Sequence, residues 1–471
     1  MTGGNNNGLR VAIVGTGSGA FAAAIQAVER GARVTIIEDA DIIGGTCVNT
    51  GCVPSKIMLR GAQIAHLQGH HRFDGIPLDT PKIDRRAMVL QQQRMVEQLR
   101  HTKYESILES SPGINLVRGM ARFRDATTLI VTKADGSEQE ISSDRILLAV
   151  GARPAIPAVR GLADTPYWTS TEALVAEYIP THLVILGGSV VALELAQAFH
   201  HLGSVVTVMA RSTLLSKEDP AIGAGLKTIL EDEGIEVQLH TVPTSISHDG
   251  RNFAVSTEHG ETKCERLLVA TGRRSNADTL ALENTGVETS AAGNIIIDNH
   301  MRTSVEHIYA AGDCTTQPQY VYVAAAAGAR AARNMTGEDI AIDLSAMPAV
   351  VFTDPQVATV GLSEQQAGDR GPDVESRTLD LENVPRALAN MDSRGFIKLV
   401  AEKGSGRIVG CQVLAHEGGE IIQTAALAIH NRMCIRDLAD QLFPYLTMVE
   451  GLKLCAQTFS KDLKQLSCCA G

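Results

Sequence analysis

Two cysteines in a glycine-rich stretch offer redox chemistry. Cys47 and Cys52 are separated by four residues, and Pro54 follows closely. Proline is typical of the first turn of a helix, so we expect Cys52 at a helix N-terminus, where the helix dipole favours the thiolate. Lys56 would lie on the same helix face and add positive charge. This pattern predicts a pair that can close as a reducible disulfide, not two buried structural cysteines.

A second pair of thiols, Cys468 and Cys469, stands side by side near the end of the printed sequence. Chain ends are usually frayed and solvated, which is a poor place for side chains that pack as small hydrophobes. Thiolates are soft ligands that select soft metals, and adjacent thiols can pass an ion to another pair by ligand exchange. Most of the other cysteines are expected to pack in the core; they are Cys264, Cys314, Cys411, Cys434 and Cys455.

Residues 9–39 predict a strand, a glycine turn, a helix and a second strand. The spacing Gly15-x-Gly17-x-x-Ala20 matches the dinucleotide-binding turn. The first glycine permits the tight turn, the second lets a pyrophosphate approach a helix N-terminus, and the small third residue lets helix and strand pack closely. Glu38, 23 residues after Gly15, ends the second strand, where an acid can bind a ribose hydroxyl.

A second unit of this kind spans residues 181–212. Its turn is altered, because Ser189 stands where the second glycine is expected after Gly187. The ribose-binding acid is also missing, and Arg211 follows its position. An arginine there suits a 2′-phosphate and hence NADPH, and Lys217 is a further candidate for this contact. Surface charges without a ligand remain the alternative for both side chains.

Size and composition predict a protein of several domains without a nucleic-acid partner or a membrane span. A chain of 471 residues predicts two to four domains. Its net charge of −11 without a basic block argues against a nucleic-acid partner, and it contains no apolar run long enough to span a membrane. The N-terminal residues show no signal pattern, so we expect a cytoplasmic protein without a disulfide framework. The histidines show no paired zinc-ligand spacing, and His70, His71, His200 and His201 are expected on solvated faces.

From Val11 to Gly471, the order of these motifs resembles the flavin-dependent pyridine nucleotide–disulfide oxidoreductases, such as glutathione reductase. The resemblance implies an α/β fold with two Rossmann-like nucleotide-binding domains and an α+β dimerisation domain. The expected limits are 1–155 with 278–347 for FAD, 156–277 for NADPH, and 348–471 for the dimer interface. It also implies a homodimer in which each subunit completes the active site of its partner.

The resemblance also assigns residues to the two cofactors. Asp313 is expected on the ribityl side of the flavin, and Glu194 is expected to pair with Lys56 beside it. Cys52 is expected nearer the flavin, as the charge-transfer thiolate, and Cys47 is expected to be the exchanging thiol. The remaining assignments to the cofactor sites are Gly19, Gly45, Thr46, Gly151 and Gly272.

One stretch near the C-terminus bears on the substrate. Family members that reduce a disulfide carry a His-Pro motif whose histidine protonates the leaving thiolate. Here Phe443 precedes Pro444, and phenylalanine cannot donate a proton. Together with Tyr445 and the two cysteine pairs, this stretch resembles the branch of the family that reduces mercuric ions.

That resemblance implies an NADPH-dependent enzyme that reduces Hg(II) to volatile Hg(0) for detoxification. Small thiols would deliver Hg(II), Cys468 and Cys469 of one subunit would capture it, and Cys47 and Cys52 of the other would receive it. Tyr445 would line the metal site, unless it is simply an aromatic residue of the interface core.

Two other functions stay open at this point. One is a reductase of an organic or protein disulfide with the C-terminal thiols as a relay, which Phe443 argues against. The other is a non-catalytic carrier of soft metals, which the nucleotide motifs argue against. Many members of the mercury-reducing branch have an N-terminal metal-binding domain; here only eight residues precede the first strand, so we interpret the sequence as the catalytic core.

Overall fold

The computed structural model describes residues 8–371 and 373–465. The chain divides into two compact units, each built from three segments. The first unit consists of residues 1–57, 87–155 and 272–343, and the second of residues 58–86, 156–271 and 344–471. Among the described helices, none is both long and apolar enough to cross a membrane.

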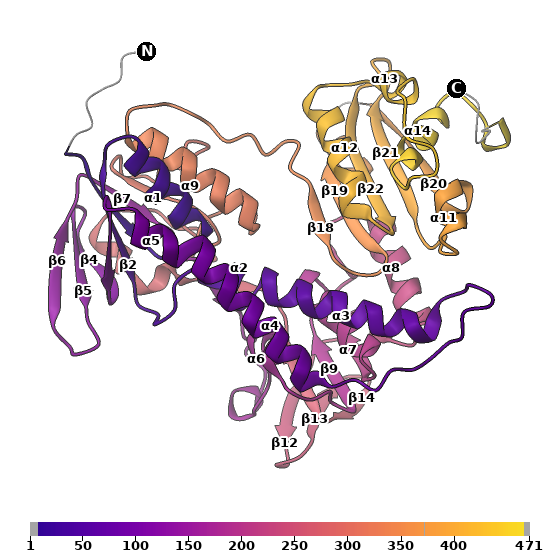
Figure 1. Ribbon diagram of the computed structural model, residues 1–471, viewed down its shortest axis with the longest axis horizontal. Helices are drawn as coiled ribbons and strands as arrows, with labels where there is room; N and C mark the ends of the chain where they lie inside the picture. Colours follow the sequence, from indigo (N-terminus) through magenta and orange to yellow (C-terminus); the bar gives the residue numbers. More distant parts are fainter. Residues whose placement is uncertain (1–7, 372, 466–471) are drawn as a thin grey trace. The chain divides into compact units, whose positions relative to one another are not determined.

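A parallel sheet of five strands forms the centre of the first unit (Figure 1). The strand order β17-β7-β1-β2-β3 puts the first strand of the chain in the middle. Residues 11–14 of this strand are buried, as expected for a parallel strand that is covered on both faces. The strands are β1 (Arg10–Val14), β2 (Arg33–Glu38), β3 (Ile114–Arg118), β7 (Arg145–Leu148) and β17 (Ile308–Ala310).

Two helices pack on each other beside this sheet, α1 (Ser18–Glu29) and α9 (Val321–Met335). Their backbones approach at Gly19 and Gly328, where a Cβ on Gly328 would lie 2.0 Å from the Gly19 oxygen. Only glycine allows such an approach, so this contact fixes the position of α1 and of the turn that precedes it.

The remaining elements of the first unit surround the sheet. One antiparallel sheet contains β4 (Met120–Asp125), β5 (Thr128–Thr132) and β6 (Glu138–Ser142), and β8 (Ala152–Pro154) pairs with β16 (Arg273–Ser275). Helix α4 (Arg85–Arg100) continues through a π-helical turn (His101–Glu105) into α5 (Ser106–Ser110).

The second unit repeats the strand–helix–strand pattern, as the sequence predicts. Its parallel sheet has the order β11-β10-β9-β15, with α7 (Val190–His201) joining β9 to β10 and α8 (Pro220–Asp232) joining β10 to β11. The strands are β9 (His182–Leu186), β10 (Val205–Met209), β11 (Glu236–Gln238) and β15 (Arg266–Val269). Helix α6 (Ser170–Val175) and an antiparallel sheet complete this part, the latter with β12 (Ser245–His248), β13 (Phe253–Thr257) and β14 (Gly260–Cys264).

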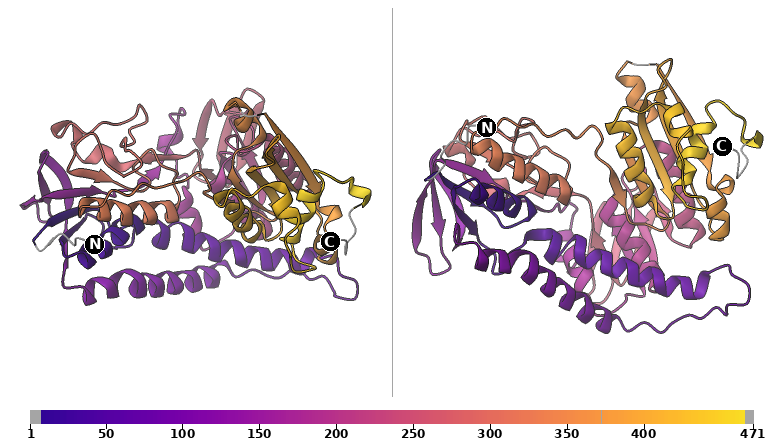
Figure 2. Two further views of the ribbon diagram at one scale, coloured as in Figure 1. Left: turned by 90° about the horizontal axis from the view of Figure 1, so that it is seen from above. Right: turned by 45° about the horizontal axis from the view of Figure 1, so that its top comes forward.

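From Ala349 the second unit continues as a sheet of five antiparallel strands, in the order β18-β19-β22-β21-β20. Helix α12 (Gly418–His430) packs on β19 and β22, and α14 (Glu450–Gln457) packs on β20 and β21 (Figures 1 and 2). The α+β character predicted for this region is therefore confirmed. The strands are β18 (Ala349–Val351), β19 (Gln356–Gly361), β20 (Val374–Asp380), β21 (Phe396–Glu402) and β22 (Ile408–Ala415). The shorter helices are α10 (Glu364–Asp369), α11 (Pro385–Ala389) and α13 (Ile435–Ala439).

Candidate active site

Two consecutive helices carry the first cysteine pair. The short helix α2 (Gly45–Asn49) contains Cys47, and α3 (Cys52–His70) begins at Cys52. The prediction that Cys52 lies at a helix N-terminus is therefore confirmed. Gly44, with φ +102°, caps α2 in the left-handed conformation, which lets the chain turn sharply from the sheet into the two helices.

The two thiols interact directly. A hydrogen bond with Cys52 is the largest cause that raises the pKa of Cys47, and burial adds to it, while the positive charge of Lys56 opposes the shift. Both the contact with Cys52 and burial favour the protonated form of the Cys47 thiol. Cys47 is half-buried and Cys52 is exposed. This asymmetry makes Cys52 the better placed of the two to carry a thiolate, with the α3 dipole behind it.

The turn between β1 and α1 lies against the helix that contains Cys47. Gly15 has φ +107°, and a Cβ there would lie 2.4 Å from the Ala149 oxygen, so this position requires glycine. A Cβ at Gly17 would meet no atom within 4 Å, which leaves space in front of this helix N-terminus. The start of α2 contacts this turn closely, because a Cβ at Gly45 would lie 2.7 Å from the Gly17 Cα. Open space at a helix N-terminus fits a pyrophosphate, and the contact brings the redox helices next to it.

Thr16 connects the acid at the end of β2 with the redox helices. Its hydroxyl donates a hydrogen bond to Glu38, and the Gly44 N–H donates to Thr16 Oγ1 at 3.2 Å. Burial raises the pKa of Glu38, and the bond from Thr16 works against that shift. Sequence reasoning missed Thr16 because the dinucleotide-binding pattern allows any residue between its first two glycines.

Valine at position 16 is expected to weaken FAD binding by about 10-fold or more, because a hydrogen bond to a carboxylate is worth about 1.5–3 kcal/mol. Valine keeps the shape of threonine but leaves Glu38 and the Gly44 N–H without this partner. Calorimetric titration of the apoprotein with FAD measures the effect. Thr279→Val, in the same unit, is the matched control, because the Thr279 hydroxyl bonds only the nearby Asn276 oxygen at an exposed site. Equal FAD affinity in the two variants would contradict the role given to Thr16.

Tyr104 is a second residue that sequence reasoning missed. Its hydroxyl lies 3.1 Å from Ser18 Oγ, and its ring packs edge-on against Phe21 with centroids 4.9 Å apart. Burial is the main cause that raises the Tyr104 pKa, and the charges of the nearby Cys47 and Cys52 raise it further. Tyr104 lies in the π-helical turn, and such turns are frequent at functional sites.

Asp313 follows the edge strand of the first sheet. Its carboxylate lies 3.5 Å from Arg273 Nε, and burial raises its pKa. Gly151 and Gly272 both have positive φ, and a Cβ on either would meet no atom within 4 Å. Thr46 lies in α2, while Gly19 and Ala20 are buried in α1. All of these predicted cofactor residues belong to the first unit.

The altered glycine turn lies at the start of α7 in the second unit. Gly187 has φ +136°, and a Cβ there would lie 2.3 Å from the Ala270 oxygen, so the first glycine is required even though Ser189 replaces the second. Ser189 is the N-cap residue of α7. Arg211 and Lys217 follow β10 and are both exposed, so their contact with a nucleotide stays a prediction.

Glu194 lies on α7 and is only 4% exposed. Its Oε1 accepts a hydrogen bond of 2.9 Å from the Phe352 N–H, which ties α7 to the segment before β19. Glu194 belongs to the second unit and Lys56 to the first, so their pairing stays a prediction.

The segment that follows α13 contains the residues expected to bear on substrate choice. Phe443 is partly buried and packs against the core of the five-stranded antiparallel sheet. Tyr445 is 55% exposed, whereas Glu450 is buried and accepts the Leu446 N–H at 3.3 Å. Cys468 and Cys469 lie outside the described residues.

Four of the five cysteines outside the two pairs are buried, and Cys434 is not. Cys264, Cys314, Cys411 and Cys455 are buried, as predicted for core side chains. Cys434 is instead half-buried and is the N-cap residue of α13, where its N–H donates to Asp437. A polar N-cap position is hard to distinguish in sequence from a core position when cysteine occupies it.

Comparison with known proteins agrees with this geometry. A family model described as pyridine nucleotide-disulphide oxidoreductase matches residues 9–328, and the dimerisation domain of that family matches residues 347–456. Among solved structures, the Cu(II) complex of the HOCl-induced flavoprotein disulfide reductase RclA from Escherichia coli has a TM-score of 0.87 at 28% identity. That match covers 97% of this chain and 100% of RclA. LpdA from Mycobacterium tuberculosis has a TM-score of 0.85 at 27% identity, covering 96% of this chain and 100% of LpdA.

Curated relatives are closer in sequence. The mercuric reductase of Shigella flexneri is 61% identical over 474 residues, which cover 99% of this chain and 84% of that protein. The mercuric reductase of Streptomyces lividans is 43% identical, and the match covers 99% of both chains. With both domain models matched and these identities over nearly its whole length, the chain belongs to the mercuric reductases of the pyridine nucleotide-disulphide oxidoreductase family.

Proposed function

We propose that Cys47 and Cys52 form the site at which this NADPH-dependent oxidoreductase reduces Hg(II) to Hg(0). The observation that carries the proposal is the hydrogen-bonded pair of thiols at the start of α3, next to the glycine turn that fits a pyrophosphate. Two thiols in contact form a ligand set that a soft, thiophilic cation prefers over oxygen or nitrogen.

The first unit suits FAD and the second suits NADPH. Gly15, Gly17 and Glu38 would hold the FAD pyrophosphate and ribose, while Arg211 and Lys217 would bind the 2′-phosphate of NADPH. When bound, NADPH would supply two electrons as a hydride, and FAD would relay them to the site held by Cys47 and Cys52. The net reaction balances as NADPH and Hg(II) giving NADP⁺, a proton and Hg(0).

The thiols have different tasks in this scheme. Metal binding requires thiolates, so the proton that Cys47 holds leaves when Hg(II) binds, and the positive charge of Lys56 favours that loss. Tyr104, which is bonded to Ser18, lies near enough for the charges of the two cysteines to raise its pKa. Uncharged mercury has little affinity for thiolates and leaves the site once it has accepted two electrons.

The substrate stretch favours a metal ion over an organic disulfide. Reduction of a disulfide requires a general acid for the leaving thiolate. Phe443 cannot supply a proton, and Hg(II) reduction needs none at that position. We therefore propose that Hg(II), and not an organic disulfide, is the substrate. Tyr445, two residues after Phe443, is assigned to the metal site.

The proposal also covers the oligomeric state of the enzyme and the way in which Hg(II) reaches it. The matched dimerisation domain supports a homodimer. We infer that small thiols deliver Hg(II), that Cys468 and Cys469 receive it, and that they pass it to the Cys47–Cys52 pair of the partner subunit. A compartment rich in reduced thiols suits both steps, so we place the enzyme in the cytoplasm.

Purified enzyme is expected to oxidise NADPH when Hg(II) is added with excess thiol, and to release volatile mercury in equal amount. NADPH absorbance and mercury trapped from the gas phase measure the two sides of the reaction. Oxidised glutathione in place of Hg(II) is the control substrate and is expected to support little oxidation. Rapid reduction of glutathione disulfide without mercury release would instead favour the disulfide reductase.

A further inference from the structure

Histidine rings form a stack inside the second unit. His66 and His70 lie one turn apart on α3, and their rings stack with centroids 4.0 Å apart. The other face of His66 stacks on His201 at the end of α7, with centroids 3.9 Å apart. The side chain of His201 is only 3% exposed, so the expectation of a solvated face is wrong for this residue. The reason is tertiary, because α3 covers the end of α7.

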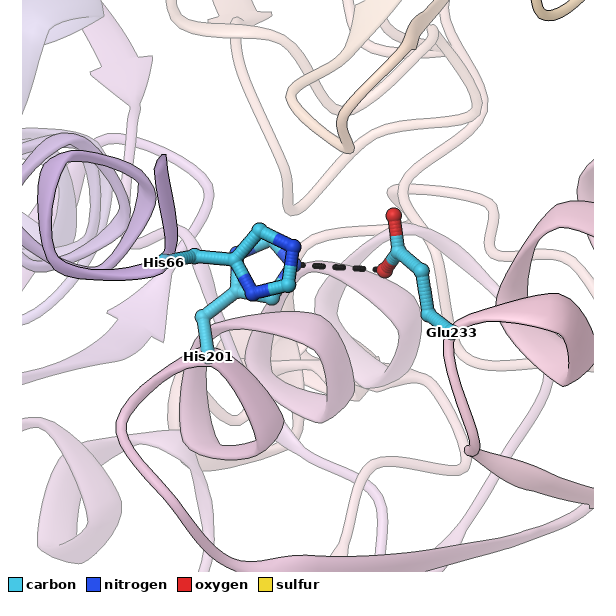
Figure 3. Close-up of side chains that lie close together, drawn as sticks. All are labelled: His66, His201 and Glu233. Atoms are coloured by element: carbon cyan, nitrogen blue, oxygen red, sulfur yellow. Dashed lines mark hydrogen bonds and ion pairs between the residues drawn. The ribbon is translucent and has the colours of Figure 1, made fainter. Parts of the chain in front are cut away.

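A buried carboxylate faces this stack. Glu233 follows α8 and its side chain is 9% exposed. Its Oε2 lies 3.2 Å from His201 Nε2 and accepts a hydrogen bond of 2.9 Å from Gln197. Figure 3 shows the three side chains reaching one point from three elements, and one ligand atom from each of His66, His201 and Glu233 lies within 4.8 Å of the other two.

We propose that His66, His201 and Glu233 form a binding site for one divalent cation of the zinc type. Two imidazoles and one carboxylate are a known zinc donor set, with water in the fourth position. Ligand atoms around a tetrahedral zinc ion are about 3.3 Å apart, given metal–ligand distances of about 2.0–2.1 Å. The pair formed by His201 and Glu233 already has this spacing. The ligand atom of His66 lies within 4.8 Å of the other two, so the third ligand is also close to the same point.

The charges around the site favour a divalent cation. The guanidinium of Arg394 faces three carboxylates, at 2.6 Å from Glu233, 3.8 Å from Asp354 and 2.8 Å from Asp392. With neutral histidines, this group carries two more negative charges than positive ones.

The same contacts prepare the carboxylate as a ligand. Arg394 binds Oε1 of Glu233, whereas Oε2 faces His201 and Gln197. A carboxylate held on one oxygen by an arginine presents the other oxygen in a fixed direction, as outer-shell partners do at metal sites. The competing explanation is a metal-free ion pair between His201 and Glu233. That pair does not involve His66, so a substitution of His66 distinguishes the metal site from the metal-free ion pair.

Cobalt(II) is a suitable probe, because its absorption spectrum distinguishes nitrogen and oxygen ligands from sulfur. The test uses the full flavin-loaded enzyme with Cys47 and Cys52 oxidised and accessible thiols alkylated. We expect one Co²⁺ per chain, with visible d–d bands, without sulfur-to-cobalt charge transfer, and displaced by Zn²⁺. His66→Gln should weaken this binding by at least about 100-fold, since loss of an outer-shell partner alone costs about 10–100-fold.

His259→Gln is the matched control, since His259 is 63% exposed on a hairpin turn, and it should bind Co²⁺ like the parent. Zn²⁺ should also raise the melting temperature of the parent and of His259→Gln but not of His66→Gln. Because His201→Gln removes a buried contact with Glu233 on which folding also depends, the conclusion depends on His66→Gln. Equal Co²⁺ binding by His66→Gln and the parent, or no binding by either, would leave the metal-free ion pair as the correct description.

Discussion

Serine in place of Cys52 is expected to lower Hg(II)-dependent NADPH oxidation by at least about 1000-fold, the scale on which loss of a reacting nucleophile lowers turnover. The hydroxyl of serine does not ionise at neutral pH, even at a helix N-terminus, and its oxygen is a hard ligand with little affinity for mercury. The variant should keep its FAD, because Cys52 starts α3 and is exposed, and takes no part in the glycine turn. Steady-state NADPH absorbance with Hg(II) and excess thiol measures turnover, and flavin absorbance per chain measures cofactor content.

Cys434→Ser is the matched control for this experiment. Cys434 is also accessible and also lies at a helix N-terminus, as the N-cap of α13. Serine is a preferred N-cap residue, so the substitution should leave both stability and turnover nearly unchanged. If Cys52→Ser kept more than a tenth of the parent activity, the electrons would have to reach Hg(II) by another route.

Local patterns were enough to predict the nucleotide-binding part of the fold. The first turn could be placed because Gly15, where the backbone requires glycine, lies within a few residues of Gly17 and Ala20 in the spacing of the motif. The start of α3 at Cys52 could also be predicted, because Pro54 and the helix dipole act over a single turn. Each of these features depends on neighbours in the chain, which a sequence displays directly.

Features that depend on distant contacts could not be predicted in this way. Thr16 is held by a hydrogen bond to Glu38, 22 residues away, and Tyr104 by a hydrogen bond with Ser18, 86 residues away. No motif specifies either residue: the glycine motif allows any residue at position 16, and Tyr104 lies outside the motifs. The burial of His201 has the same origin, because it requires α3 to pack on the end of α7.

Alanine in place of both Cys468 and Cys469 is expected to lower turnover on thiol-complexed Hg(II) by at least about 10-fold, with FAD content unchanged. Mercury held by two small thiolates is released only as new thiolates replace them, so removal of the first acceptors slows its transfer to Cys47 and Cys52. Both tail residues lie outside the described part of the chain, so the prediction depends on their chemistry alone. Ser467→Ala is the control within the same segment, and equal turnover in the two variants would exclude a role for the tail thiols.

Mixed dimers then decide which subunit each tail serves. One parent carries Cys468→Ala and Cys469→Ala, and the other carries Cys47→Ser, so each is expected to have little activity alone. If the tail acts on its partner, a mixed dimer contains one complete site, formed by the Cys47–Cys52 pair of the first subunit and the tail of the second. Activity should therefore appear after the two proteins are unfolded and refolded together, and in proportion to the fraction of mixed dimer. Mixed dimers that are as inactive as both parents would show that each tail serves its own subunit, because neither subunit of such a dimer holds both pairs of thiols.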